Sequence, residues 1–86
     1  MDHLFSQHAL KQMDLRGIPM EIVESIIARP DQKLEHDNLM VLQSIVRDIN
    51  EQRFLIRVFL NINKTPALVV TVYKTSKIEK YYEGKI

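Results

Sequence analysis

The sequence predicts an α+β domain in which two helices pack on one face of a three- to four-stranded antiparallel sheet. Apolar residues recur at helical spacing in the first third of the chain. From residue 33 onward, branched apolar residues alternate with polar ones, and turn-forming residues separate the alternating segments. A chain of 86 residues is expected to form one domain, over residues 1–86.

Two helices are expected, at about residues 6–16 and 19–28. Ser6 suits the N-cap of the first helix because its hydroxyl can accept a hydrogen bond from a free backbone N–H. Gly17 suits its end, where a left-handed residue is commonly needed. Pro19 is tolerated in the first turn of the second helix.

Strands are expected after the helices because the apolar period changes from about 3.6 residues to 2. Turn formers lie at Asp48 to Gln52 and at Asn63 to Pro66. The last dozen residues are expected to form a short helix or an irregular tail. The expected strands cover about residues 33–36, 39–49, 53–62 and 67–73.

Alternation along the last two strands sorts their side chains between the two faces of the sheet. It predicts that Arg57, Thr71 and Tyr73 lie together on the face away from the helices. Phe59 and Val69 are expected to form an apolar floor on that face. The residues of the 67–73 strand expected to face the helices are Leu68, Val70 and Val72.

Charge is distributed unevenly along the chain. Residues 1–52 carry five Lys/Arg against nine Asp/Glu, a net charge of −4, whereas residues 53–86 carry seven against two, a net charge of +5. A basic C-terminal half suggests an anionic partner, although chance clustering on a solvated surface would produce the same pattern. The chain has no cysteine, no secretory leader and no apolar run of membrane-spanning length, so a cytoplasmic protein with no membrane partner is expected.

The first helix carries His8, Gln12 and Arg16 along one edge of its apolar stripe, at i, i+4 and i+8. The positive end of the helix dipole disfavours a charged imidazole and favours a bound anion near His8. A neutral imidazole beside a phosphate is a candidate general base, although a lone histidine more often packs or caps locally. No His, Asp or Glu spacing resembles a zinc pattern, so no metal site is expected.

The run from Ser6 to Ile18, together with the ending Thr71-Val72-Tyr73, resembles a small bacterial family of domains of unknown function. Its members open with a Ser-x-His-Ala-x-x-Arg-Met-x-x-Arg-Gly-Ile helix and close with a Thr-Val-Tyr strand. That family is similar in architecture to the barnase, colicin and RelE-like group of metal-free ribonuclease toxins. One departure is Gln12, which stands where the family has the first arginine of its helix.

The resemblance implies a toxin of a toxin–antitoxin pair that cleaves RNA without a cofactor. The RNA 2′-hydroxyl would attack the adjacent phosphate, and the protein would transfer protons and stabilise the added negative charge. We assign proton transfer to His8 and phosphate charge to Arg57 and Lys77. The candidate catalytic residues are His8, Arg57, Tyr73 and Lys77. The candidate substrate-binding residues are Arg16, Thr71, Thr75, Ser76, Lys80 and Tyr81.

Two alternatives use the same scaffold. The substitution at Gln12 favours a regulatory module that binds RNA or protein without cleaving it. The two-helix layer can also pair with itself, as a homodimer, or with a cognate antitoxin. An antitoxin would be expected to cross the basic region of Lys77 and Lys80.

Overall fold

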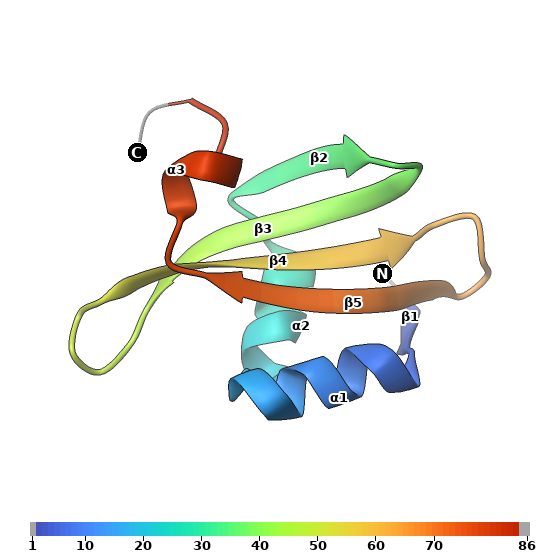
Figure 1. Ribbon diagram of the computed structural model, residues 1–86. Helices are drawn as coiled ribbons and strands as arrows, with labels where there is room; N and C mark the ends of the chain where they lie inside the picture. The colour runs from blue at the N-terminus through green and yellow to red at the C-terminus, as the bar shows by residue number, and fades with distance from the viewer. Residues whose placement is uncertain (1, 85–86) are drawn as a thin grey trace.

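The computed structural model describes residues 2–84. Its strands form one mixed sheet of five strands in the order β1-β5-β4-β3-β2 (Figure 1). The chain is therefore an α+β domain, as predicted. The elements in chain order are β1 (His3–Phe5), α1 (Gln7–Arg16), α2 (Met20–Ala28), β2 (Gln32–His36), β3 (Leu39–Arg47), β4 (Arg53–Asn61), β5 (Ala67–Thr75) and α3 (Ile78–Tyr81).

The sheet differs from the expectation at one edge. The strand β1 pairs in parallel with β5, His3 opposite Ala67 and Phe5 opposite Val69. The prediction of a three- to four-stranded, wholly antiparallel sheet is therefore wrong in strand number and at this edge. Three residues before a helix are too few to show a period of two, so the pairing is set by β5 rather than by a pattern in β1.

The strands β2 to β5 form the expected antiparallel meander. The strand β3 ends at Arg47, earlier than the expected residue 49, because the turn begins at Asp48. The Asp48 carboxylate accepts hydrogen bonds from the backbone N–H groups of Asn50, at 2.8 Å, and Gln52, at 2.9 Å. Ile49 is consequently left 95% exposed at the hairpin tip.

The first helix begins and ends where the sequence predicted. The Ser6 hydroxyl accepts a hydrogen bond from Ala9 N at 3.0 Å. At the other end Gly17 has φ of 63°, a left-handed conformation that glycine adopts without a Cβ penalty. The N–H of Ile18 then reaches the carbonyl of Met13 at 2.8 Å. No helix within residues 2–84 is both long and apolar enough to cross a membrane.

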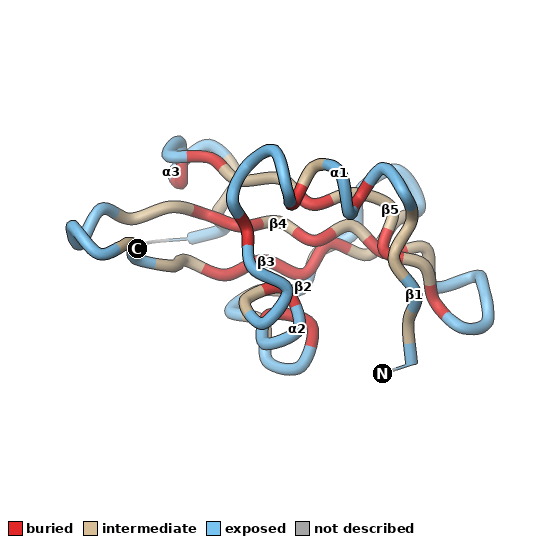
Figure 2. The backbone as a smooth tube through the Cα atoms, turned by 90° about the horizontal axis from the view of Figure 1, so that it is seen from below, coloured by how far each residue is buried: buried red, intermediate tan, exposed pale blue. Residues whose placement is uncertain are grey.

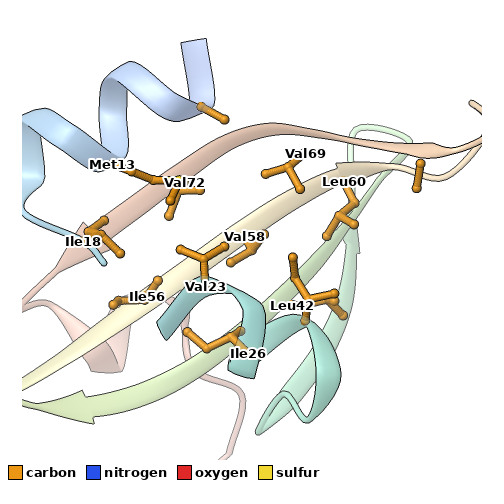
Figure 3. Close-up of a cluster of buried hydrophobic side chains, with 13 residues drawn as sticks. Met13, Ile18, Val23, Ile26, Leu42, Ile56, Val58, Leu60, Val69 and Val72 are labelled. Atoms are coloured by element: carbon orange, nitrogen blue, oxygen red, sulfur yellow. The ribbon is translucent and has the colours of Figure 1, made fainter. Parts of the chain in front are cut away.

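The main core lies between one face of the sheet and the helices α1 and α2 (Figure 3). In Figure 1 α2 passes behind β4 and α1 lies below β5, whereas α3 lies at the upper left, beside β2. The tube in Figure 2 is buried mainly along the middles of the strands and at the inward turns of the helices. The core residues are Ala9, Met13, Ile18, Val23, Ile26, Ile27, Leu42, Ile56, Val58, Leu60, Ala67, Val69 and Val72.

A β-bulge in β5 changes the predicted division of its faces. Phe59 pairs with Thr71 but Leu60 pairs with Val69, so Val70 is an extra residue in the ladder. Val69 is fully buried in the main core with Val72, rather than forming the floor of the opposite face. The assignment of Val69 to the open face and of Leu68 and Val70 to the core was therefore wrong. Strict alternation fails at a bulge because one residue is added without a partner.

The bulge is tied to the first helix by Ser6. Its hydroxyl donates to the Val70 carbonyl at 2.9 Å, and its backbone N–H donates to the Val69 carbonyl at 3.0 Å. One side chain therefore caps α1 and also binds the irregular point of β5.

The substitution Ser6→Ala should lower the free energy of unfolding by about 1–2 kcal/mol, because it removes a helix cap and a hydrogen bond to the bulge together. Urea denaturation measures the change. The control is Ser76→Ala, which removes the hydroxyl of an exposed serine. Equal stabilities of the two variants would contradict this role for Ser6.

Candidate functional site

The face of the sheet opposite the main core is partly covered by α3. Leu55 on β4 and Gln43 on β3 are both fully buried there, outside the main core cluster. Ile78 of α3 is 7% exposed, and the carbonyl of Tyr81 accepts a hydrogen bond from the Gln43 side chain at 3.1 Å. The short C-terminal helix thus forms a small third layer that brings Tyr81 over the sheet.

Arg57 lies at the centre of this face. Its Nε donates to Oε1 of Gln43 at 2.8 Å. Its guanidinium carbon lies 4.4 Å from the ring centroid of Tyr81 and 5.1 Å from that of Phe59. Burial lowers the pKa of Arg57, and the neighbouring Tyr81 and Tyr73 act in the opposite direction. An arginine nevertheless stays protonated in proteins, so the site carries a positive charge.

No carboxylate within residues 2–84 forms an ion pair with Arg57. Its only hydrogen bond within that range goes to a neutral amide and uses Nε alone. The terminal nitrogens of the guanidinium remain as donors, in the planar fork that suits carboxylate or phosphate oxygens. The arrangement can therefore bind an anion between aromatic walls.

Tyr73 and Tyr81 meet edge to face beside Arg57, with ring centroids 6.0 Å apart and an interplanar angle of 79°. The hydrogen bond from Tyr73 lowers the pKa of Tyr81, because it stabilises the phenolate. Desolvation opposes this shift, whereas the positive charges of Lys80 and Arg57 add to it. Tyr81 consequently ionises more readily than an ordinary tyrosine.

Two further cations border these residues. The guanidinium carbon of Arg16 lies 5.8 Å from the ring centroid of Tyr73, and Nζ of Lys80 lies 5.4 Å from that of Tyr81. Arg16 reaches this face because α1 runs beside β5, near the sheet edge (Figure 1). We call Arg57, Tyr73 and Tyr81, with Arg16 and Lys80 at their border, the arginine–tyrosine cluster. The sequence predicted all of these residues as site residues.

His8 is not part of the arginine–tyrosine cluster. It lies eight residues before Arg16 on the same helix, a separation of about 12 Å at 1.5 Å per residue. Its side chain is exposed, and no hydrogen bond or ion pair within residues 2–84 joins it to Arg57 or Tyr73. The structure therefore does not bring the predicted proton-transfer residue to the predicted phosphate-binding residue.

Lys77 and Ser76 line a solvent-open hollow of about 520 Å³ beside α3. Lys80 borders both this hollow and the arginine–tyrosine cluster, so the two regions are adjacent. The hollow contains a carboxylate as well as cations. Its lining residues are Arg53, Ser76, Lys77, Ile78, Glu79 and Lys80.

The two predicted threonines have different surroundings. Thr71 pairs with Phe59 in the β4–β5 ladder and is half-buried on the face of the cluster. Thr75 is 9% exposed, and its hydroxyl accepts a hydrogen bond from Lys77 N at 3.0 Å. That bond turns the chain from β5 into α3, so the Thr75 hydroxyl stabilises the turn.

Gln43 is the residue that the sequence reasoning missed. It is the one amide within an apolar strand, and its register partner in β4 is Arg57. Counting alternate positions would have placed it on the face of Arg57, but burial depends on α3, which lies far away in the sequence. No group of three or more histidine or acidic side chains in the described part of the chain could hold a metal ion.

Replacing Tyr73 with phenylalanine should raise the pKa of Tyr81 toward its ordinary value, because the phenolate loses its principal hydrogen bond. An NMR titration of isotope-labelled tyrosine follows each ring separately. The variant Tyr82→Phe is the matched control and should leave the titration of Tyr81 unchanged. An unaltered midpoint in Tyr73→Phe would contradict the hydrogen-bonded pair.

Comparison with known proteins identifies one family. Residues 5–74 match the family described as "Domain of unknown function (DUF4258)", a segment that includes Arg16, Gln43, Arg57 and Tyr73 and stops before Tyr81. Neither the curated proteins nor the solved structures contain a significant match. Because the matched segment covers well over half of the chain, this protein belongs to the DUF4258 family.

Proposed function

We propose that the chain is a metal-independent ribonuclease domain, of the toxin type that its sequence resembles, and that the arginine–tyrosine cluster is its active site. The observation that carries the proposal is Arg57, a half-buried cation with no carboxylate partner within residues 2–84. A buried charge without a counter-ion is costly, and a bound anion would offset that cost.

The surroundings of Arg57 favour a nucleic acid over a small anion. Aromatic rings flank the guanidinium, and single-stranded RNA is bound largely by stacking of its bases on such rings. Arg16 and Lys80 border the rings, and the hollow beside α3 adds Arg53 and Lys77. These cations would contact phosphates on both sides of the one held by Arg57.

The chemistry of RNA cleavage fits the groups present. The 2′-hydroxyl oxygen forms a bond to phosphorus as the bond from phosphorus to the 5′-oxygen breaks, leaving a cyclic phosphate and a free 5′-hydroxyl. Tyr81, whose pKa is lowered, would accept the proton of the 2′-hydroxyl as phenolate. Lys80 would supply the proton to the leaving oxygen, and Arg57 would stabilise the charge that develops on the phosphate.

This assignment moves proton transfer from His8 to Tyr81. His8 lies two helical turns away from the end of α1 that reaches Tyr73. A role for His8 in contacting RNA outside the cleaved bond remains compatible with its exposed position. The absence of an imidazole from the cluster also favours the alternative, a module that binds RNA without cleaving it.

The variant Arg57→Gln should lower the rate of RNA cleavage by about 100-fold or more, because charge on the phosphate loses its principal partner. The measurement uses purified protein, treated with a chelator, and a single-stranded RNA. The control is Arg29→Gln, a change of an exposed arginine after α2. If the wild-type protein binds the RNA with steep salt dependence but leaves it intact, cleavage is rejected and the binding module is supported. If the wild-type protein does not bind RNA at low salt, both proposals are rejected.

Cleavage by the wild-type protein should accelerate with rising pH until Tyr81 is ionised. The rate rises with pH because only the phenolate form of Tyr81 accepts a proton. Because the pKa of Tyr81 is lowered, this rise in rate should occur at a lower pH than an ordinary tyrosine would give. In Tyr81→Phe the rate should fall and this pH dependence should disappear. A variant with the wild-type pH profile would show that another group is the base.

A further inference from the structure

Gln43 joins the two sides of the arginine–tyrosine cluster. Its Oε1 accepts the hydrogen bond from Arg57 Nε at 2.8 Å. Its Nε2 donates to the carbonyl of Tyr81 at 3.1 Å and to Oε1 of Gln32 at 2.8 Å. The side chain is fully buried and its oxygen and nitrogen both have partners. The amide cannot be turned over, because each end faces a group of the opposite kind.

Gln32 extends this contact to the tail of the chain. Its Nε2 donates to the carbonyl of Glu83 at 2.6 Å, and its Oε1 accepts from the N–H of Glu83 at 3.0 Å. The Gln32 side chain thus pairs with one backbone unit in the way that a neighbouring strand would. Two linked glutamine amides therefore attach the segment after α3 to the strands β2 and β3.

The helix α3 depends on such contacts for its position. It contains four residues and has no side-chain cap at its start. A helix of this length does not form alone in water, because the cost of its first turn is not repaid by further hydrogen bonds. Tyr81 is held over Arg57 by the apolar contact of Ile78 and by the hydrogen bond from Gln43.

We propose that Gln43 is a positioning residue that holds the guanidinium of Arg57 and the phenol of Tyr81 at a set distance from each other. A purely structural side chain at this position would need only to fill the space. Gln43 instead orients Nε of one site residue and the backbone of the other with a single rigid group. Its effect on catalysis rests on the proposed function, whereas its effect on the geometry of the two residues does not.

The test replaces Gln43 with methionine, which has a similar length and no amide. The matched control is Gln7→Met, on the exposed side of α1. The first measurement is the NMR titration of labelled tyrosine. Release of Tyr81 from Arg57 should raise the midpoint of Tyr81 in Gln43→Met, while Gln7→Met should keep the wild-type midpoint. Thermal unfolding of both variants shows that the domain remains folded.

The second measurement is the cleavage of RNA at saturating concentration. Displacement of reacting groups by about 1 Å lowers rates by roughly 100-fold, so Gln43→Met should show a loss approaching that size in kcat. The variant Gln43→Glu retains an acceptor for Arg57 but replaces the donor to Tyr81. It should therefore keep Arg57 in place and still release Tyr81. The variant Gln32→Met should free Glu83 with a smaller effect on Tyr81.

The two measurements separate the positioning role from the proposed function. An unchanged tyrosine titration in folded Gln43→Met and Gln43→Glu would overturn the positioning role, whatever the RNA result. A shifted titration in a protein whose wild type does not cleave RNA would retain the positioning role and reject the ribonuclease. A titration that shifts equally in Gln7→Met would also overturn it, because the effect would not depend on the amide.

Discussion

The hydrogen bond from the Ser6 hydroxyl to the Val70 carbonyl joins the two features on which the arginine–tyrosine cluster depends. It lies at the bulge in β5, where the face reached by successive side chains changes. Before the bulge Val69 points into the main core, and after it Val72 does so, which leaves Tyr73 on the opposite face as the register partner of Arg57. Because Ser6 also caps α1, the same residue fixes where that helix begins beside β5. The start of the helix in turn sets the position of Arg16 at its other end, next to Tyr73.

The domain uses its two sheet faces differently. The face under α1 and α2 is an apolar core, formed by hydrocarbon and thioether side chains that need no hydrogen-bond partner. The other face mixes buried apolar residues with a buried amide whose oxygen and nitrogen both have partners, and with the cation Arg57, which binds that amide through Nε alone. The helix α3 and the residues just after it cover this face. This second face is therefore the part of the fold in which chemistry and stability depend on the same contacts.

In the proposed reaction, the structure favours a different base from the one that the sequence suggested. An imidazole at the start of α1 and a guanidinium in the middle of β4 suggested a shared site, but the helix carries His8 away from the region that Arg16 reaches. For the proposed reaction the phenols beside Arg57 are better placed than His8, and the hydrogen bond from Tyr73 lowers the pKa of Tyr81. Membership in the DUF4258 family leaves the reaction open, so the proposed activity depends on the cluster itself.

The sequence by itself determined the α+β class, the two helices with the Ser6 and Gly17 ends, and the antiparallel meander that follows them, because these follow from local period and capping. It also placed Arg57 and Tyr73 on one face, since β4 alternates without interruption and Tyr73 lies after the bulge in β5. Only the tertiary structure decided the parallel pairing of β1, the bulge at Val70, the burial of Gln43 and the position of Tyr81. Each of these arises from contact between segments far apart in the chain, and such contacts leave no period in the sequence of either segment.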